Sequence, residues 1–500
     1  MQAEKSKAPK DLGHQVAKGG AILVLLRLSI RGIGLISTMI LFRVLAPGDF
    51  GLVALAMVVV GLAEVMAEFG FDQNLLRDKH AVRADYDVAW TLTFLRGVIV
   101  ATLLVLMAGP AASYLNEPRL TSIVYWLALA PLLDGVGNIG VVDFSKELQF
   151  GKEYTLKVSQ KVCSFILTLI FAFALRNYWA LVIGILTGKV AGMALSYGLH
   201  PYRPRFSLKG ARRVFAFSFW IFLNQLVLYA GNQTDKILIQ KYYDATKVGI
   251  FRVAEEVCSI VMELVWPVER ALFAGYAKLS DDFEQLRRAV LNSTGLVAML
   301  GVPMSLIIML VAEPAVVVLL GERGRAAAPF VQVLVLHGAI RSCFAGAGPA
   351  FMVLGKPQIN MQITLFAVAV RLSILFTCFP VLGVMVAPWS LVAGSCVSFL
   401  TVWVQLKRHM RLRWRDYPRS IWRTAVAAGV MCAVVKGVGT VPAIATLFGN
   451  DWIHLLIAVP LACASYLLSL ALLWRLSGAP VGPETQARRL LWNALGRAGA

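Results

Sequence analysis

Charged side chains stand inside long apolar runs of this chain of 500 residues, and their types and spacing could serve anion binding and ion coupling. Arg27 and Arg31 lie four residues apart, so on a helix they share one face. Glu64 and Glu68 repeat that spacing in the next apolar run. A guanidinium binds two phosphate oxygens at once, and a carboxylate can carry a proton or Na⁺. These four residues predict an anion site with ion-coupling carboxylates or, alternatively, a ladder of ion pairs between two helices.

A second charged stripe is expected in the apolar run 247–275. Arg252 and Arg270 are separated by about five whole helical turns, so they lie on one line along the helix. Glu256 and Glu263 fall within about 40° of that line. A charged stripe that faced lipid would not insert, so this stripe must face the protein interior. It adds Arg252 and Arg270 to the predicted cation site and both glutamates to the ion-coupling candidates.

Amide side chains gather in the apolar run 214–240, where Asn224, Gln225, Asn232 and Gln233 stand among hydrophobic residues. Their hydrogen-bonding groups would suit sugar hydroxyls, so they are candidates for sugar contact. Polar side chains inside spans also join neighbouring helices, and that interpretation stays open for each of them.

The elements that must position these side chains are membrane spans. Hydrophobic residues make up 58% of the chain and charged residues 15%, against about a quarter charged in soluble domains. Each span needs about 20 apolar residues. The apolar runs predict about fourteen helices, near 18–45, 49–76, 88–114, 119–143, 155–175, 178–199, 214–240, 247–275, 289–320, 326–354, 358–380, 384–406, 421–440 and 452–475. In the sixth, small residues recur every four positions and predict a close-packing face: Ala180, Gly184, Gly188, Gly192 and Ser196.

Basic residues concentrate in loops, above all at 203–213 and 407–423. The positive-inside rule places both loops in the cytoplasm, and an even number of spans then places both termini there. The formal net charge of +20 therefore predicts contact with membrane lipids and no nucleic-acid partner. Residues 1–16 read as a cytoplasmic segment before an anchor and not as a cleaved signal.

Motifs for cofactor chemistry are missing from the sequence. It holds no GxxxxGK[ST] phosphate-binding loop, and its six histidines never approach the spacing of a metal site. Its seven cysteines form no CxxC pair and read as apolar filler. We therefore expect no cofactor, no metal and no ATP hydrolysis.

The sequence contains an internal repeat. LFRVLAPGDFGLVALA at 41–56 has a second copy, IQKYYDATKVGIFRVA, at 239–254. Val44–Ala54 falls on Tyr242–Arg252, a shift of 198 residues from 44 to 242. Pro47 and Gly48 break one helix in the first copy, and Asp49 can cap the next, so each copy is a helical hairpin. Two further landmarks follow in the same order at nearly the same offset.

Repeats with an even number of spans run in the same sense and typically close around a cavity that alternates between inward- and outward-open states. The predicted fold class is an all-α integral membrane protein with about 14 transmembrane helices, forming two parallel-repeat six-helix lobes around a central cavity plus two extra C-terminal helices. The predicted divisions are a cytoplasmic N-terminal segment (1–16), an N-lobe (17–199), a basic linker (200–213), a C-lobe (214–406), a basic loop with two spans (407–475) and a cytoplasmic tail (476–500).

RVLAPGDFGLVALAMVVVGLAEVMAEFGFDQNLLR (43–77) closely resembles the hairpin of Wzx-type oligosaccharide flippases, in the multidrug/oligosaccharidyl-lipid/polysaccharide exporter superfamily. The likeness extends through KELQFGKEYTLKV (146–158) and, with the repeat, covers most of 17–406. It implies a non-enzymatic flippase in the bacterial inner membrane that moves undecaprenyl-pyrophosphate-linked oligosaccharide for O-antigen, capsule or exopolysaccharide assembly. Coupling to H⁺ or Na⁺ would drive it, and polysaccharide polymerase or chain-length machinery would be its protein partners. A multidrug or cation antiporter and a lipid II flippase are the alternatives within the superfamily.

Overall fold

The computed structural model describes residues 9–66, 82–147, 149–208, 218–277, 279, 282–413, 415–439, 450–478 and 482–485. Regular structure in these residues is entirely helical. The chain forms two compact units, Met1–Gly249 and Ile250–Ala500, and each is described here by itself.

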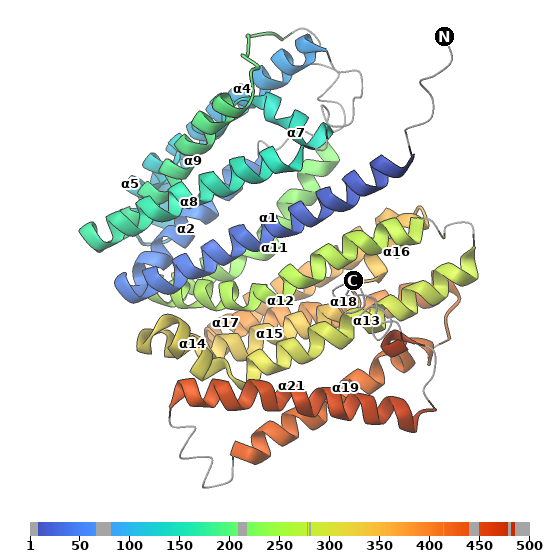
Figure 1. Cartoon of the computed structure of the whole chain (residues 1–500). Helices are drawn as coiled ribbons and strands as arrows, with labels where there is room; N and C mark the ends of the chain where they lie inside the picture. The colour runs from blue at the N-terminus through green and yellow to red at the C-terminus, as the bar shows by residue number, and fades with distance from the viewer. Residues whose placement is uncertain are drawn as a thin grey trace, which may run out of the picture. The chain divides into compact units, whose positions relative to one another are not determined.

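The first unit is built from long helices that run alongside one another (Figure 1). A short 3₁₀ turn, Ile139–Val141, precedes α7. The helices are α1 (Pro9–Val44), α2 (Pro47–Met66), α4 (Arg83–Tyr114), α5 (Arg119–Leu127), α6 (Leu129–Val136), α7 (Val142–Lys146), α8 (Phe150–Leu175), α9 (Trp179–Leu199) and α11 (Ser218–Tyr242).

Helix α12 (Ala245–Ala277) begins in the first unit and continues in the second. A 3₁₀ segment, Glu322–Ala327, separates α14 from α15. The remaining helices of the second unit are α13 (Phe283–Leu310), α14 (Ala312–Leu320), α15 (Ala328–Ser342), α16 (Ala347–Val353), α17 (Pro357–Leu382), α18 (Val386–Met410), α19 (Asp416–Gly439) and α21 (Asp451–Leu476).

The expectation of an all-α membrane protein is confirmed. Twelve segments of the described residues are long and apolar enough to cross a bilayer. Of the fourteen predicted spans, the two at 214–240 and 247–275 are missing from these twelve, although α11 and α12 are helices of 25 and 33 residues. The count of fourteen spans stays a prediction.

Two of the predicted spans differ in detail because proline interrupts them. The predicted span 119–143 is divided into α5 and α6, and Pro131 stands in the first turn of α6. The predicted span 289–320 is divided into α13 and α14, with Pro314 in the first turn of α14. A proline lacks the N–H that would bond one turn back, so each helix restarts where that bond is lost.

The close-packing face predicted on α9 is confirmed. Helices α8 and α9 lie side by side (Figure 1). A Cβ atom added to Gly184 would lie 1.7 Å from the Thr168 hydroxyl oxygen, and one added to Gly188 would lie 2.9 Å from Ser164 Cβ. Glycine therefore lets these two helices approach more closely than any other residue would allow.

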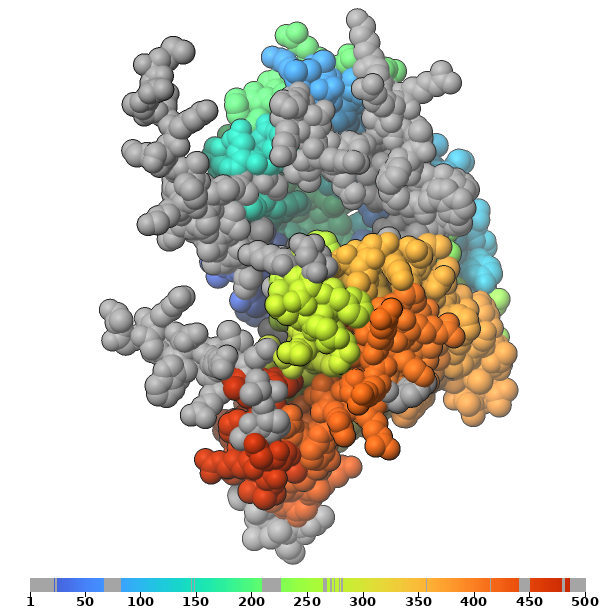
Figure 2. Space-filling view, turned by 90° about the vertical axis from the view of Figure 1, so that its right-hand side faces the viewer, coloured from blue at the N-terminus to red at the C-terminus, as the bar shows by residue number. Residues whose placement is uncertain are grey.

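The two helices after the basic loop belong to the second unit, where both contact α13. Helix α19 contacts both α21 and α13, and Figure 2 shows the orange surface of α19 adjoining the yellow-green start of α13. The shared interior holds Ala298, Met431 and Tyr466. Residues 482–485 return to the same region, where Pro483 Cγ would lie 2.4 Å from a Cβ atom added to Gly295.

Candidate functional site

Helix α1 carries the first predicted cation pair. The side chains of Arg27 and Arg31 are both partly buried. Helix α1 packs along α8, and a hydrogen bond of 3.1 Å between the Ser29 and Tyr154 hydroxyls fixes the register of the two helices. Both arginines therefore lie on a helix whose position in the first unit is set by its contact with α8.

Lys161 of α8 belongs to the same neighbourhood. Its Cε would lie 4.0 Å from a Cβ atom added to Gly34, which follows Arg31 by one helical turn. Neither Arg27 nor Lys161 forms an ion pair with a described residue. Sequence spacing on one helix could not select Lys161, because its relation to Arg31 depends on how α1 and α8 pack. The result is a set of three basic side chains on two adjoining helices.

The carboxylates predicted on α2 are only partly described. Glu64 is partly buried, and it lies close enough to the Tyr229 phenol of α11 to interact with it electrostatically. Glu68 lies outside the described residues. The predicted ladder between α1 and α2 gains no support from Arg27, which pairs with no described carboxylate. Tyr229 was missed by sequence reasoning because a tyrosine in an apolar run gives no distinctive signal.

The four amides predicted for sugar contact lie on α11. The side chains of Asn224 and Gln225 lie outside the described residues. Asn232 is exposed. Gln233 accepts a hydrogen bond of 3.1 Å from the Lys236 ammonium through its Oε1, so part of its hydrogen-bonding capacity is used within its own helix.

The charged stripe predicted on α12 begins with an ion pair inside the helix. The Arg252 guanidinium lies 3.4 Å from Glu256 Oε2 and 3.6 Å from Glu255 Oε2. Glu263 is partly buried, and the side chain of Arg270 lies outside the described residues. Glu255 was missed because the stripe was drawn along one line, whereas a long guanidinium also reaches the residue three positions away.

The second unit holds a further polar cluster at the contact of α12, α15, α17 and α18. His337 Nδ1 lies 2.5 Å from the Ser395 hydroxyl, and Arg341 lies 3.9 Å from Glu269 Oε1. Arg371 is 5% exposed, and both its guanidinium and that of Arg341 act electrostatically on the His337 ring. These residues come from four helices, so no spacing along the sequence predicts that they meet.

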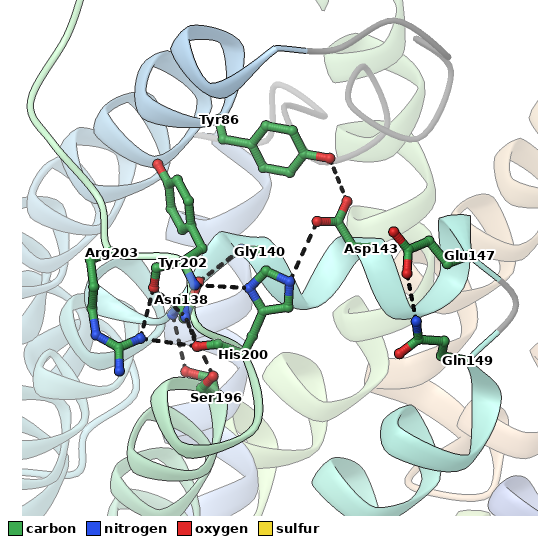
Figure 3. A network of polar contacts seen from close by, with 10 residues as sticks. All are labelled: Tyr86, Asn138, Gly140, Asp143, Glu147, Gln149, Ser196, His200, Tyr202 and Arg203. Atoms are coloured by element: carbon green, nitrogen blue, oxygen red, sulfur yellow. Dashed lines mark hydrogen bonds and ion pairs between the residues drawn. The ribbon is translucent and has the colours of Figure 1, made fainter.

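A polar network links α4, α7 and the segment that follows α9 in the first unit (Figure 3). Asn138, which is 2% exposed, donates to the carbonyls of His200 and Tyr202 at 3.1 and 2.9 Å. His200 Nε2 lies 3.5 Å from Asp143 Oδ2, and the Tyr86 hydroxyl donates to the same carboxylate.

This network anchors the segment that follows α9. The Tyr202 hydroxyl donates to Asp87 Oδ1 at 2.5 Å, and burial, followed by this hydrogen bond, raises the pKa of the phenol above its ordinary value. The Ser207 amide donates to Thr91 Oγ1 at 2.9 Å. Among the described residues, no group of three His, Cys, Asp or Glu side chains could hold a metal ion. The hydrogen bonds of Tyr202 to Asp87 and of Ser207 to Thr91 attach the start of the predicted basic linker to α4.

The chain is similar in sequence to proteins of polysaccharide and lipopolysaccharide biosynthesis. It is 24% identical to "Lipopolysaccharide biosynthesis protein WzxC" of Escherichia coli (strain K12) over 84% of this chain and 88% of that protein. It is also 24% identical to "Succinoglycan biosynthesis transport protein ExoT" of Rhizobium meliloti (strain 1021), over 62% of this chain and 63% of that protein.

The fold has a solved counterpart. The structure titled "Lipid II flippase MurJ, inward closed conformation" superposes with a TM-score of 0.74, covering 90% of this chain and 99% of that one at 10% identity. At this identity the likeness concerns the fold alone.

The resemblance drawn from 43–77 and 146–158 is confirmed at the level of the family. The profile described as "Polysaccharide biosynthesis protein" matches residues 40–329, more than half of the chain. This matched region includes both copies of the repeated hairpin and the helices that carry most of the predicted site. The chain belongs to the polysaccharide biosynthesis protein family.

Proposed function

We propose that this chain is a flippase that carries an undecaprenyl-pyrophosphate-linked oligosaccharide from the inner to the outer leaflet of the bacterial inner membrane, with both termini in the cytoplasm. The observation that carries the proposal is the set of basic side chains on α1 and α8. Arg27, Arg31 and Lys161 lie within candidate spans, where a cation is costly unless it faces a partner or a water-filled path. A pyrophosphate is a partner with several oxygens for these groups.

One further observation supports the proposal; the transport cycle itself is our expectation. The relatives in polysaccharide and lipopolysaccharide biosynthesis include one whose name describes a transport protein. An oligosaccharide could meet the amides of α11, while its prenyl tail stays in lipid. Alternating access coupled to H⁺ or Na⁺ would supply the energy, with no catalytic step on the chain. Polymerase or chain-length proteins would take the cargo on the outer side.

The test is mass spectrometry of lipid extracts from cells depleted of this chain. We expect an undecaprenyl-pyrophosphate oligosaccharide to accumulate, and its mass would identify the sugar unit. Re-expression of the wild-type chain should clear it. The double variant Arg27→Gln with Arg31→Gln should not, because two charge-assisted contacts worth about 1.5–3 kcal/mol each are lost, which predicts a fall in transport of at least about tenfold.

Arg408→Gln is the matched control, since Arg408 is an exposed cation in the predicted cytoplasmic loop at the end of α18. It should clear the intermediate like the wild type. Unchanged lipid intermediates and normal surface polysaccharide after depletion would overturn the flippase proposal. An efflux assay with cationic drugs would then test the multidrug alternative, and accumulation of lipid II would identify the other one.

A further inference from the structure

An ion pair stands at mid-membrane depth in the first unit. Lys189 is the central residue of α9, whose ends are Trp179 and Leu199, and Asp134 lies in the last turn of α6. The Lys189 ammonium lies 2.5 Å from Asp134 Oδ2, and both residues belong to candidate membrane spans. The side chains are 31% and 48% exposed. Charges that faced hydrocarbon at this depth would be costly, so the exposed part of the pair must face a water-filled path.

The packing of α8 against α9 places Lys189 on the same side as Lys161. Three glycines of α9 lie against side chains of α8, and the residue numbers fall on α8 as they rise on α9: Thr168 with Gly184, Ser164 with Gly188 and Gln160 with Gly192. The two helices are therefore antiparallel. In an antiparallel pair of right-handed helices, the residue that follows a contact residue turns to the same side on both. Lys189 follows Gly188 and Lys161 follows Gln160, so both side chains point to one side of the helix pair.

Helix α1 packs on that same side. The Lys161 side chain reaches α1, where its Cε would lie 4.0 Å from a Cβ atom added to Gly34. Arg27 and Arg31 precede Gly34 on this helix. Lys189 therefore adds a fourth basic side chain, from a third helix, to the set on α1 and α8.

Lys189 differs from the rest of this set because it has a carboxylate partner. Asp134 is its one ion-pair partner in the described part of the chain, whereas Arg27 and Lys161 form no ion pair there. Asp134 stands in the C-terminal turn of α6, where the helix dipole disfavours a negative charge and favours a positive one. The carboxylate thus depends on the ammonium, and it regains the ammonium whenever no stronger anion holds it.

The pair is not needed to hold α6 on α9. The Tyr197 hydroxyl donates to the Val136 carbonyl at 2.8 Å, and the Asn138 amide donates to Ser196 Oγ at 3.0 Å. These uncharged hydrogen bonds already attach the end of α6 to α9. A half-exposed ion pair contributes little beyond them, because water screens it. A charged pair kept at this depth without a large gain in stability points to a role in transport.

We infer that Asp134 is an internal counter-ion that exchanges with the pyrophosphate for the Lys189 ammonium, an inference that rests on the proposed function. When the lipid-linked pyrophosphate enters, Lys189 leaves Asp134 and binds phosphate oxygens. When the cargo departs, Asp134 takes the ammonium back. Four cations would otherwise hold the pyrophosphate tightly, whereas transport needs a site from which the cargo also leaves. Asp134 is thus a positioning residue that lowers the affinity and speeds release.

The variant Asp134→Asn tests this exchange, because the amide keeps the size of the side chain and removes its charge. The probe for binding is undecaprenyl pyrophosphate, titrated into the purified chain in lipid nanodiscs. Flipping is measured in proteoliposomes with the lipid-linked oligosaccharide from depleted cells. We expect the Kd to fall about three- to fivefold and the maximal flipping rate to fall by a similar factor, since tighter binding mainly slows dissociation. A purely structural role would not lower the Kd.

A double-mutant cycle isolates the pair. In the Lys189→Gln background, Asp134→Asn should no longer tighten binding, because no ammonium is left to release. Asp134→Glu keeps the charge and should bind and flip like the wild type. The matched control is Glu284→Gln, on a 58% exposed carboxylate in the first turn of α13, and it should change neither quantity.

The exchange would be overturned by an unchanged Kd in Asp134→Asn, by equal tightening in both backgrounds, or by tighter binding without a slower maximal rate. Loss of folding in Asp134→Asn would make the pair structural and would overturn it as well. A wild-type chain that neither binds undecaprenyl pyrophosphate nor flips the accumulated lipid would overturn the proposed function itself.

Discussion

Arg423 and Glu484 form a two-point ion pair near the carboxyl-terminal end of the chain. The distances are 2.9 Å from Nε to Oε1 and 3.1 Å from Nη2 to Oε2, and the side chains are only 8% and 11% exposed. Removing the carboxylate in Glu484→Ala leaves a buried guanidinium without its counter-charge, which typically costs about 3–5 kcal/mol. We expect a clear fall in the melting temperature of the purified protein in detergent, measured by thermal shift.

The matched control at this scale is Glu322→Ala. Glu322 lies 3.2 Å from Arg325, but it is 74% exposed, so the pair is screened by solvent and contributes little to stability. Its melting temperature should match that of the wild type. Equal shifts for the two variants would show that residues 482–485 contribute nothing through this buried pair. The sequence predicted only a cytoplasmic tail here, because one glutamate after the last span gives no sign of a partner 61 positions earlier.

At the scale of the single residue, helical spacing foresaw which residues lie near one another on the same helix, while the roles assigned to them stay predictions. Arg27 and Arg31 share one helix and are both partly buried, and Arg252 and Glu256 are joined one turn apart. Contacts between helices were out of reach. Lys161 gains meaning only once α1 and α8 are packed, since neither its neighbours in sequence nor its type distinguishes it from a lysine that extends to the membrane surface.

At the scale of the element, small residues allowed a helix contact to be predicted, whereas a proline did not show whether its span is divided. The four-residue recurrence on α9 predicted its contact with α8, because residues four apart lie on one face and small side chains let helices approach. The division of the predicted span 119–143 was missed, although Pro131 is visible in the sequence. A proline inside a span often leaves only a kink, so its presence does not tell whether the helix bends or restarts.

The α8–α9 contact yields a prediction with a built-in control. Gly184→Leu should force the two helices apart, because even a Cβ atom there would lie 1.7 Å from Thr168 Oγ1. Gly198 lies on the same helix, and a Cβ atom added there would meet nothing within 4 Å, so Gly198→Leu is the control. We expect the first variant to lose thermal stability and yield after membrane extraction, by an amount typical of core overpacking, about 1–3 kcal/mol or more. The second should behave like the wild type, and a reversed order would contradict the assigned face.

At the scale of the whole molecule, three kinds of information are consistent with one another: hydropathy, the internal repeat and the family match. Each of them rests on different features of the sequence. Span positions follow from the need to bury backbone groups in lipid, which restricts the chain to apolar helices. The repeat was read from the sequence, in which Gly51 and Gly249 stand at equivalent positions. The structure places these two glycines in contact within the first unit. The predicted division into lobes at 199 and 214 stays a prediction, since the first compact unit also includes α11.

Ion coupling is the property of the whole transporter that remains to be measured. In Glu64→Gln with Glu68→Gln, both side chains keep their size but can no longer exchange a proton or bind Na⁺ as a carboxylate. Flipping in proteoliposomes should then become independent of an imposed pH or Na⁺ gradient, whereas the wild type should follow one of them. Glu322→Gln, on an exposed residue, controls for the loss of a negative charge. A double variant that still follows the gradient would move the coupling site away from α2 and toward Glu256 and Glu263 of α12.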